Sequence, residues 1–462
     1  MGPMKTVLCA LLGLLPIAQS ALGGAPGDRD LAADVVRETK RTWDAYVAFA
    51  WGHDELRPLS RGYSDWYGEP LYISPIDAYD TLAIMGLSAD AKRIEDLAAN
   101  EVSFDKDVYV KTFECNIRIL GGLLSMYDMT GNPRVLAKAE DFARRLLPAF
   151  ETKSGLPRYY VNLRTGASRG DTVCAAEAAS YLVEFGVLSF YTQNPRYYQA
   201  AKACTRRIFD SRSALGLIGK DYDVTSGACL DHDSLAGCYV DSYYEYIYKA
   251  WRLFHDPELK AMWDPSLAAI NRYLATTRRG ELWYAMADSA TGRVKDTTVT
   301  LWDPYLVGLL AYAGDLDHAT RSYSAWNRLW RVNGLLPMGY DFSADRILNP
   351  RYYLNPELIE SCYYMICLTN DPRYGADLRQ YYGDIKKYCR TDTAYAHVAD
   401  VVSKRQVDEM STFFIAETLK YFYLGFSRDP AFDLDHVVFS TEAHPFVISH
   451  FGADRIRTGL GL

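Results

Sequence analysis

The sequence predicts an all-α protein folded as one domain, and three observations support this fold class. Apolar residues recur with the 3.6-residue period of a helix along nearly the whole chain. Turn signals such as Gly131-Asn132-Pro133 and Asn194-Pro195 separate the periodic stretches. No Pro/Ser-rich linker and no change of composition divides the 462 residues.

The first expected helix covers 31–50, where Leu31, Val35 and Trp43 lie on one apolar stripe. Asn or Asp followed by Pro, as at Asp256-Pro257, marks several later helix starts, because the first residue caps and Pro fits the first turn. Periodicity leaves open whether the helical pairs close into a ring or stack as an open solenoid. Further helices are expected over 76–98, 112–130, 134–150, 173–192, 197–209, 240–254, 257–276, 297–314, 317–332, 356–369, 371–389 and 408–426, and short strands over 158–163 and 437–440.

The first 25 residues have the order of a secretory signal peptide. Lys5 precedes an apolar run over 6–18, and small residues follow from Ser20 onward. The run is short for a membrane span, although a signal anchor is the alternative. We therefore expect an exported protein, periplasmic or secreted, whose mature domain covers 26–462 and keeps no membrane span.

Composition and cysteine spacing exclude several classes of function. A net charge of −8 and a pI near 5.6 argue against a nucleic-acid partner, which needs a basic face. The 36 tyrosines suit sugar binding, but tyrosine also fills helix contacts, and composition alone favours the second interpretation. The cysteines beyond the leader form no CxxC pair and no zinc pattern. Export permits disulfides, and Cys229 with Cys238 is the nearest-neighbour pairing.

Two acidic pairs at helical spacing are candidates for chemistry. Glu114 lies one turn before Arg118, which predicts either a surface ion pair or a partly buried acid held beside a pocket. Asp241 and Glu245 also share a helix face, among the tyrosines of 243–248. A carboxylate there suits a polyol-binding cleft, and Asp241 as a simple helix cap is the alternative.

A third segment places Glu357 at a helix start. Asn355 is the expected N-cap and Pro356 the first helical residue, so Glu357 falls in the first turn. The helix dipole and free N–H groups there favour the ionised form that a general base needs. Glu360 projects from the same side, and ordinary acidic enrichment of a first turn is the alternative.

The stretch 411–427 is apolar nearly all round, so we expect a buried helix. It carries Glu417, and a buried carboxylate needs a partner because its unpaired desolvation is costly. Lys420 is one candidate for that partner, and a water or a ligand is the other.

The loop expected near 438–446 carries Thr441, Glu442 and His444. Zinc binding by His444 is disfavoured because no second histidine has suitable spacing. Hard oxygen ligands in such a loop suit calcium instead.

Together these segments resemble glycoside hydrolase family 47, the class I α-mannosidases. The resemblance covers 43–448 and also includes WGHDELRPLS, SPIDAYDTLAIMGL, KSGLPRYYVNL and VEFG in the family's order. It implies a closed (α/α)7 barrel of inner and outer helices. It also implies an inverting, exo-acting α-1,2-mannosidase with calcium at its −1 site. The implied substrate is an α-1,2-linked mannose oligosaccharide or N-glycan, and we expect a monomer.

The resemblance also implies roles for single residues. Glu114 matches the general acid and Glu357 the general base, while Asp241 matches a catalytic carboxylate that rivals Glu114 as proton donor. Thr441 matches the calcium ligand, through its hydroxyl and carbonyl oxygens. In an inverting pair the acid and base carboxyls lie roughly 6.5–9.5 Å apart, which leaves room for the attacking water. The residues that match the −1 sugar site are Arg118, Glu184, Glu360, Phe413, Glu417 and Glu442.

The departures from the family pattern concern positions that would contact the part of the substrate beyond the cleaved bond. Asn355 stands where many relatives have an Arg that contacts substrate. The segment 296–301 aligns with one that elsewhere carries a subsite histidine and half of a disulfide, both absent here. Ser411 and Thr412 replace a Glu-Ser pair. Preference for a particular glycan isomer is therefore not transferred.

Three alternatives belong to other classes of function. A catalytically weak, lectin-like relative would bind glycans without efficient hydrolysis. Another helical-barrel glycosidase, such as a glucosidase, would have no role for Thr441. An open helical scaffold for protein partners would lack an enclosed acidic cavity.

Overall fold

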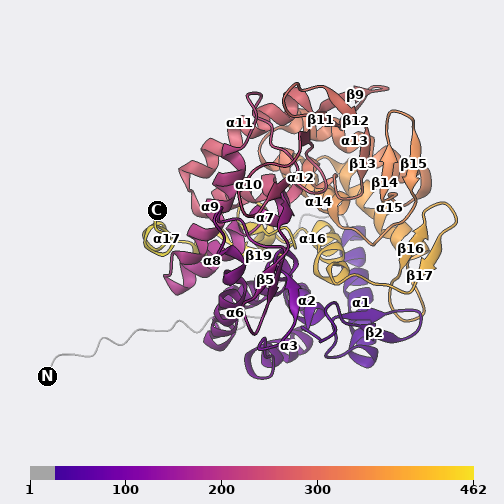
Figure 1. Ribbon diagram of the computed structural model, residues 1–462. Coiled ribbons are helices and arrows are strands. Elements are labelled where there is room, and N and C mark those ends of the chain that lie inside the picture. The colour runs from indigo at the N-terminus through magenta and orange to yellow at the C-terminus, as the bar shows by residue number, and fades with distance from the viewer. Residues whose placement is uncertain (1–25) are drawn as a thin grey trace.

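In the computed structural model of the protein, residues 26–462 are described, so the leader expected over 1–25 lies outside the described residues. The helices follow one another in sequence order round a double ring (Figure 1). Inner helices are buried on nearly every side, as in α12, where every residue is buried. Outer helices are amphipathic, so α6 buries Val135, Phe142 and Leu146 and exposes its polar face.

The inner ring is closed. Each inner helix packs against the next, and the π-helical segment η3 (Phe414–Leu419), which leads into α16, packs against α2. Thr81 on α2 donates a hydrogen bond to the Ala416 carbonyl at 3.0 Å across this junction. The inner helices are α2 (Ile73–Ile84), α5 (Gly121–Thr130), α8 (Leu182–Thr192), α10 (Asp241–Phe254), α12 (Tyr305–Tyr312), α14 (Glu357–Thr369) and α16 (Lys420–Ser427).

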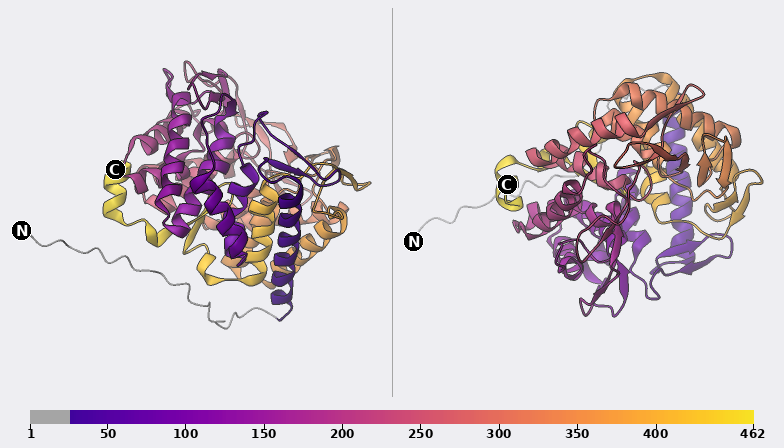
Figure 2. Two further views of the ribbon diagram at one scale, coloured as in Figure 1. Left: turned by 90° about the horizontal axis from the view of Figure 1, so that it is seen from below. Right: turned by 45° about the horizontal axis from the view of Figure 1, so that its top comes forward.

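Outer helices pack on the inner ring, and α1 lies beside α16, so the two ends of the barrel meet (Figure 2). The expected (α/α)7 barrel is confirmed. The outer helices are α1 (Pro26–Phe49), α3 (Ser88–Asn100), α6 (Pro133–Leu146), α9 (Arg196–Asp210), α11 (Pro257–Tyr273), α13 (Leu316–Asn333) and α15 (Pro372–Tyr388). Shorter helical segments are α4 (Thr112–Cys115), η1 (Asn116–Leu120), η2 (Leu147–Phe150), α7 (Ala175–Ala179), η4 (Pro430–Phe432), η5 (Ile448–His450) and α17 (Ala453–Leu460).

Some expected helix boundaries are wrong. The helix expected over 76–98 is two helices, because Gly86 adopts a φ of +75° and ends the first. The helix expected over 297–314 begins only at Tyr305, and the β-branched run before it forms the strand β13 (Thr298–Thr300). Short strands are also far more frequent than expected.

All strand pairs are antiparallel, and both expected strands, now β4 and β18, are confirmed. The remaining bounds are β1 (Glu55–Arg57), β2 (Gly62–Ser64), β3 (Tyr109–Lys111), β4 (Tyr160–Asn162), β5 (Ser168–Arg169), β6 (Thr172–Cys174), β7 (Asp221–Asp223), β8 (Asp233–Ser234), β9 (Ala275–Arg278), β10 (Glu281–Tyr284), β11 (Met286–Asp288), β12 (Val294–Asp296), β14 (Gly339–Asp341), β15 (Arg346–Asn349), β16 (His397–Asp400), β17 (Arg405–Val407), β18 (Val437–Phe439) and β19 (Pro445–Val447).

The connections give the barrel two different ends. From an inner helix to the next outer helix the chain makes a short turn, as at 131–132 and 255–256. From an outer helix to the next inner helix it makes a long, strand-bearing loop, as over 274–304. The first turns of the inner helices therefore meet at the end that carries the loops.

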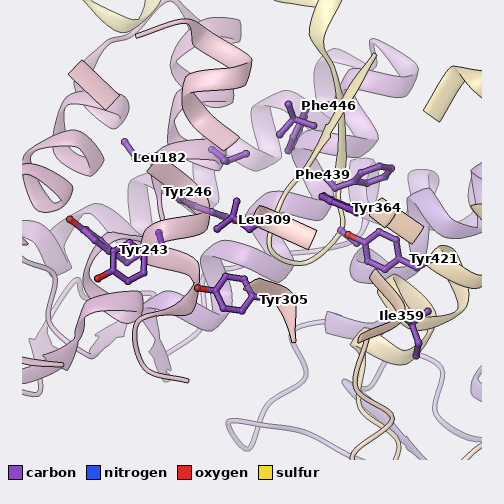
Figure 3. Packing of buried hydrophobic residues seen from close by; sticks show 14 of the residues in the cluster. Leu182, Tyr243, Tyr246, Tyr305, Leu309, Ile359, Tyr364, Tyr421, Phe439 and Phe446 are labelled. Atoms are coloured by element: carbon purple, nitrogen blue, oxygen red, sulfur yellow. The ribbon is translucent and has the colours of Figure 1, made fainter. Parts of the chain in front are cut away.

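The hairpin β18–β19 enters the barrel from the opposite end. Val438 pairs with Phe446 and Phe439 with Pro445, and these residues are buried although they belong to a two-stranded hairpin. Figure 3 shows Phe439 and Phe446 among side chains of the inner helices, with the Tyr421 ring 5.8 Å from that of Phe439. The hairpin tip, 440–444, is thereby held inside the ring.

Every cysteine in the described part of the chain is a free thiol, so the Cys229–Cys238 pairing is wrong. The Cys229 thiol instead donates to the Asp231 carbonyl at 2.9 Å. Among the helices described, none combines the length and apolar character that crossing a bilayer requires.

Candidate active site

A cavity of about 300 Å³ lies where the inner-helix starts converge. It collects nine of the ten site residues expected from the sequence and leaves out only Glu184. Those lining it are Glu114, Arg118, Asp241, Glu357, Glu360, Phe413, Glu417, Thr441 and Glu442.

Buried carboxylates form the closed end of the cavity. Glu245, Glu360, Glu417 and Glu442 are each at most 8% exposed. Lys249 forms an ion pair with Glu245, and its Nζ lies 3.4 Å from Glu360 Oε1. Burial raises the pKa of Glu360 to about 7, although the Lys249 charge opposes this.

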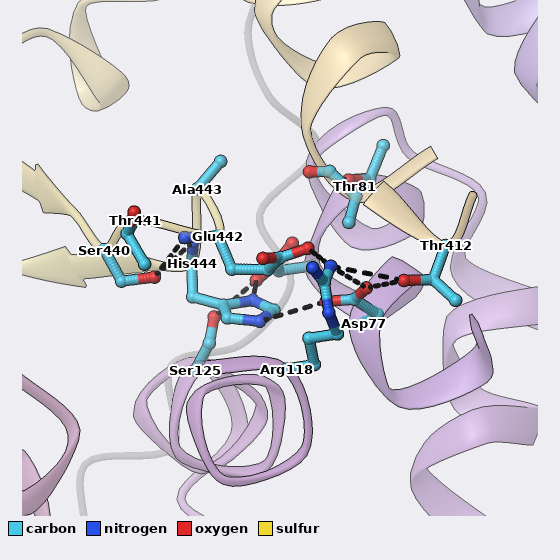
Figure 4. Close-up of polar contacts among 12 residues, drawn as sticks. Asp77, Thr81, Arg118, Ser125, Thr412, Ser440, Thr441, Glu442, Ala443 and His444 are labelled. Atoms are coloured by element: carbon cyan, nitrogen blue, oxygen red, sulfur yellow. Dashed lines mark hydrogen bonds and ion pairs between the residues drawn. The ribbon is translucent and has the colours of Figure 1, made fainter. Parts of the chain in front are cut away.

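Glu114 and Arg118 form the expected i,i+4 pair, at 3.0 Å from Nε to Oε2, and the pair lines the cavity. Arg118 also forms an ion pair with Glu442 (Figure 4). Burial opposes the guanidinium charge, but Glu442, Glu114 and Asp77 outweigh this and raise the pKa of Arg118. Thr412 Oγ1 donates to Asp77 at 2.7 Å, which ties this network to α2. The prediction that Glu114 is a partly buried acid, held by Arg118 beside a pocket, is confirmed.

Asp241 is the first residue of α10 rather than its cap. Burial raises the pKa of Asp241 to about 7, although the Ser242 N–H donates to its carboxylate at 2.8 Å. A carboxyl with this pKa is partly protonated at neutral pH, which suits a proton donor.

Glu357 is the first residue of α14, and Asn355 does not cap that helix as expected. The Asn355 amide instead donates to Glu357 Oε1 at 3.2 Å, while Oε2 is buried without a partner. Burial raises the pKa of Glu357 well above its ordinary value. Desolvation of the Glu357 carboxyl therefore opposes the ionised form that the helix start was expected to favour.

Glu417 is buried as expected, but Lys420 is not its partner. Lys420 Nζ lies 2.6 Å from Asp80 Oδ1 and donates to the Ala443 carbonyl at 2.6 Å. Burial and the charge of Glu442 raise the pKa of Glu417 well above its ordinary value. The π-helical η3 displaces Glu417 from the α-helical register on which the pairing depended.

The hairpin tip carries Thr441 into the cavity. Its backbone N–H donates to the Tyr246 hydroxyl at 3.3 Å. Behind it, the Ser440 hydroxyl accepts from the His444 N–H at 3.1 Å, and Ala443 adopts a φ of +58°. Such a conformation is unfavourable for alanine and persists only where the surroundings hold it.

Glu184 lies outside the cavity lining. It is fully buried, and it accepts hydrogen bonds from Tyr246 at 2.5 Å and Asn116 at 3.0 Å. Burial raises the pKa of Glu184 to about 7. Because Tyr246 also contacts the Thr441 backbone, Glu184 supports the tip from behind.

The structure adds cavity residues that the sequence did not single out as site residues. The sequence did mark Glu245, because its i,i+4 spacing places it on the same helix face as Asp241. Glu177, Tyr239 and Trp302 had none, because they lie on separate loops and helix starts that only the closed ring brings together.

The donor set fits a hard cation near Thr441. Glu417, Glu442, Glu360 and Glu357 line the same cavity and offer only oxygen ligands, and Glu357 Oε2 is buried without a partner. Calcium accepts hydroxyl, carbonyl, carboxylate and water oxygens. In the described residues no group of three or more His, Cys, Asp or Glu side chains is arranged so that these side chains alone could hold a metal ion.

Comparison with known proteins identifies the family. The model for glycosyl hydrolase family 47 matches residues 38–448. ER degradation-enhancing alpha-mannosidase-like protein 2 of Mus musculus is 33% identical, over 94% of this chain and 82% of its own. Mannosyl-oligosaccharide 1,2-alpha-mannosidase IB of Homo sapiens is 32% identical, over 93% and 72%. The solved alpha-1,2-mannosidase of Trichoderma reesei superposes with a TM-score of 0.84 at 26% identity, over 91% of this chain and 99% of that chain. This chain therefore belongs to glycosyl hydrolase family 47.

Proposed function

We propose that this protein is an exported, inverting, exo-acting α-1,2-mannosidase that binds Ca²⁺ at its −1 site. The observation that carries the proposal is the cavity of about 300 Å³, which carboxylates close at one end. Glu114 and Glu357 approach it from different inner-ring segments, as an acid and a base acting on opposite faces of a sugar require. Relatives named as mannosyl-oligosaccharide 1,2-alpha-mannosidases support the choice of substrate.

In the proposed reaction a terminal mannose occupies the closed end of the cavity. Glu357 takes a proton from the water that attacks C1, and Glu114 gives a proton to the glycosidic oxygen. The C1–O bond breaks with inversion, so β-mannose and a saccharide with a free hydroxyl are released. Glu360, Glu417 and Glu442 accept hydrogen bonds from mannose hydroxyls, and Phe413 offers an apolar surface.

Thr441 would hold the calcium ion through its hydroxyl and carbonyl oxygens. When bound, Ca²⁺ would accept hydroxyl oxygens of the sugar as ligands and would supply positive charge that favours ionised carboxylates.

The deciding experiment is release of mannose from α-1,2-mannobiose by the purified protein. Activity that EDTA abolishes and added calcium restores supports the proposal. Saturable, calcium-dependent binding of mannobiose without hydrolysis would establish the lectin-like alternative. Release of glucose from α-glucosides, unaffected by Thr441→Ala, would establish the glucosidase.

α-Mannosyl fluoride distinguishes the proton donor, because fluoride leaves without protonation. Glu114→Gln should lose activity on mannobiose by about 10²–10⁴-fold and keep far more of it on the fluoride. Asp241→Asn should lose both activities by similar factors. The reverse pattern would make Asp241 the donor.

A further inference from the structure

A serine, a histidine and a glutamate form a hydrogen-bonded chain outside the barrel cavity. His397 Nε2 lies 2.9 Å from Ser411 Oγ, and His397 Nδ1 lies 3.3 Å from Glu409 Oε2. None of the three residues lines the cavity, and none takes part in the reaction proposed above. A hydroxyl next to an imidazole, which is next to a carboxylate, is the arrangement that activates a serine nucleophile.

The hydrogen bonds fix the tautomer of the His397 ring. The Ser411 backbone N–H donates to Nε2 at 3.2 Å, so Nε2 carries a lone pair and no proton. The proton of the neutral ring therefore lies on Nδ1, which donates it to the Glu409 carboxylate. The Ser411 hydroxyl also donates to Nε2, so the base already faces the proton that it would remove.

Separate segments of the chain hold these three side chains together. His397 begins β16 and Glu409 follows β17, and the His397 N–H donates to the Glu409 carbonyl at 2.8 Å. Arg57 Nη1, on β1, lies 3.6 Å from Glu409 Oε1, the oxygen that does not face His397. Ser411 precedes the helical turn that leads into η3, and its carbonyl accepts from the Phe414 N–H at 3.1 Å.

The backbone after Ser411 offers donors for a developing oxyanion. Thr412 and Phe413 lie in the first turn, and within the described residues their N–H groups have no hydrogen-bond partner. The N–H of the residue after a nucleophilic serine is a common oxyanion donor. The strands β16 and β17 lie at the rim of the molecule (Figure 1). Because Ser411 is partly exposed and the Glu409 side chain is 45% exposed, a substrate reaches the serine from solvent.

The surroundings of His397 make its imidazole a neutral, weak base. Burial lowers the pKa of His397 to about 4, against the charge of Glu409 and in the same direction as the charges of Arg57 and Arg351. The Tyr353 ring packs beside the imidazole, with 5.3 Å between the ring centres. The ring is therefore free to accept a proton at neutral pH. Proton transfer to a weak base is slow, so esters with good leaving groups are the most sensitive probes.

We propose that Ser411, His397 and Glu409 form a second active site, which hydrolyses carboxylic esters. Ser411 Oγ attacks the acyl carbon while its proton passes to His397 Nε2, and the Thr412 N–H stabilises the oxyanion. His397 gives this proton to the leaving alcohol as the ester C–O bond breaks, which leaves the acyl group on Ser411. Water then attacks the acyl-serine with His397 as base, so the carboxylic acid leaves and the serine is restored. This site does not depend on the proposed mannosidase activity.

Two probes test the site in the purified protein. p-Nitrophenyl acetate should give a burst of nitrophenolate, and peptide mapping should find the acetyl group on Ser411. A fluorophosphonate, whose P–F bond breaks as Ser411 Oγ attacks phosphorus, should label the same residue and block ester hydrolysis. Ser411→Ala and His397→Gln should each lower kcat/KM for the ester by about 10²–10⁴-fold. In the wild type this kcat/KM should not fall between about pH 7 and pH 5, because the base titrates near pH 4.

Ser403→Ala is the matched control, because Ser403 is exposed in the turn between β16 and β17. It should keep the labelling and the rate of the wild type, and thermal unfolding shows whether each variant is folded. Equal rates in Ser411→Ala and Ser403→Ala would overturn the inference. Mapping of the wild type decides the question if Ser411→Ala does not fold. Acetyl or phosphonyl groups on other residues, or no labelling at all, would leave Ser411 as a helix cap.

Discussion

Two opposing influences act on the ionisation of the Glu357 carboxyl group. Its place at the start of α14 favours the ionised form, while burial of Oε2 without a partner favours the protonated form. Burial outweighs the helix start and raises the pKa of Glu357. The group is therefore poised to ionise when positive charge or a hydrogen-bond donor arrives beside it.

Replacing Glu357 with Gln should separate sugar binding from turnover. The amide keeps the shape and the Asn355 neighbour but accepts no proton from water, so kcat on mannobiose should fall by about 10²–10⁴-fold. The dissociation constant of a mannose-like inhibitor, measured by calorimetry, should change by less than about fivefold. Glu69→Gln, at an exposed site, is the matched control. A variant retaining a tenth of wild-type kcat would exclude Glu357 as the base.

Thr441→Ala should weaken calcium and sugar binding together. Loss of one charge-assisted oxygen contact lowers affinity by roughly 10–100-fold. Titration of calcium into the metal-free variant, followed by titration of the sugar, measures both. Thr458→Ala, at an exposed site on α17, should leave both affinities unchanged. If Thr441→Ala alters neither, the calcium site lies elsewhere.

The hairpin β18–β19 shows why the element scale is hard to derive from sequence. An apolar run followed by Thr441 and Glu442 predicted a strand and a loop, and both are present. Its insertion into the barrel depends on buried charges from distant elements, and none of those pairs has a local sequence signal. His444 Nδ1 lies 2.7 Å from Asp80, and Nε2 lies 3.4 Å from Asp77. Figure 4 shows the His444 ring beside Asp77 under the hairpin tip.

His444 should make the hairpin sensitive to pH. Burial opposes its charge, but Asp80 and Asp77 outweigh this and raise the pKa to about 9. A group with a raised folded pKa stabilises fully below the unfolded pKa, near 6.5, and that stabilisation is lost as the pH rises towards 9. A shift of this size corresponds to roughly 3 kcal/mol.

The free energy of unfolding, from urea denaturation, should therefore fall between about pH 6.5 and pH 9. His444→Gln should remove that slope and destabilise the protein by about 3–5 kcal/mol, because two buried carboxylates lose their counter-charge. His436→Gln, on the exposed surface, should keep the slope. An identical slope in His444→Gln would place the titrating group elsewhere.

Ring closure is a property of the whole molecule that the helical periodicity of apolar residues could not predict. The helices themselves, the pairing of Glu114 with Arg118 and most cavity residues were predictable from local pattern or family motifs. Closure depends on packing between α2 and η3, which lie more than 300 residues apart in the chain, as the Thr81–Ala416 contact shows. No period of 3.6 residues encodes a contact of that range. The same closure explains why no local sequence pattern marked Tyr239 and Trp302 as cavity residues.

Calcium should stabilise the whole barrel. A ligand that binds only the folded state adds about 2.7 kcal/mol at a hundred times its Kd, which raises Tm by a few degrees in a chain of this size. Thermal unfolding of the EDTA-treated protein, with and without calcium, measures the shift. Magnesium at equal concentration should give a smaller one, because it prefers rigid octahedral coordination with retained waters. No calcium-dependent shift would argue against a site inside the ring.

In the described residues, the buried hairpin tip closes one end of the barrel, so the cavity opens at the end that carries the loops. The shortened saccharide must leave first, because it blocks the exit of the mannose beneath it. Both products have therefore left the site at the end of each catalytic cycle, and the next cleavage requires a saccharide to bind again from solution. We expect distributive trimming, in which every intermediate accumulates in solution before the shortest product appears. Chromatography of early time points on a substrate with several α-1,2 linkages would reveal it, and direct appearance of the final product would contradict exit through that end alone.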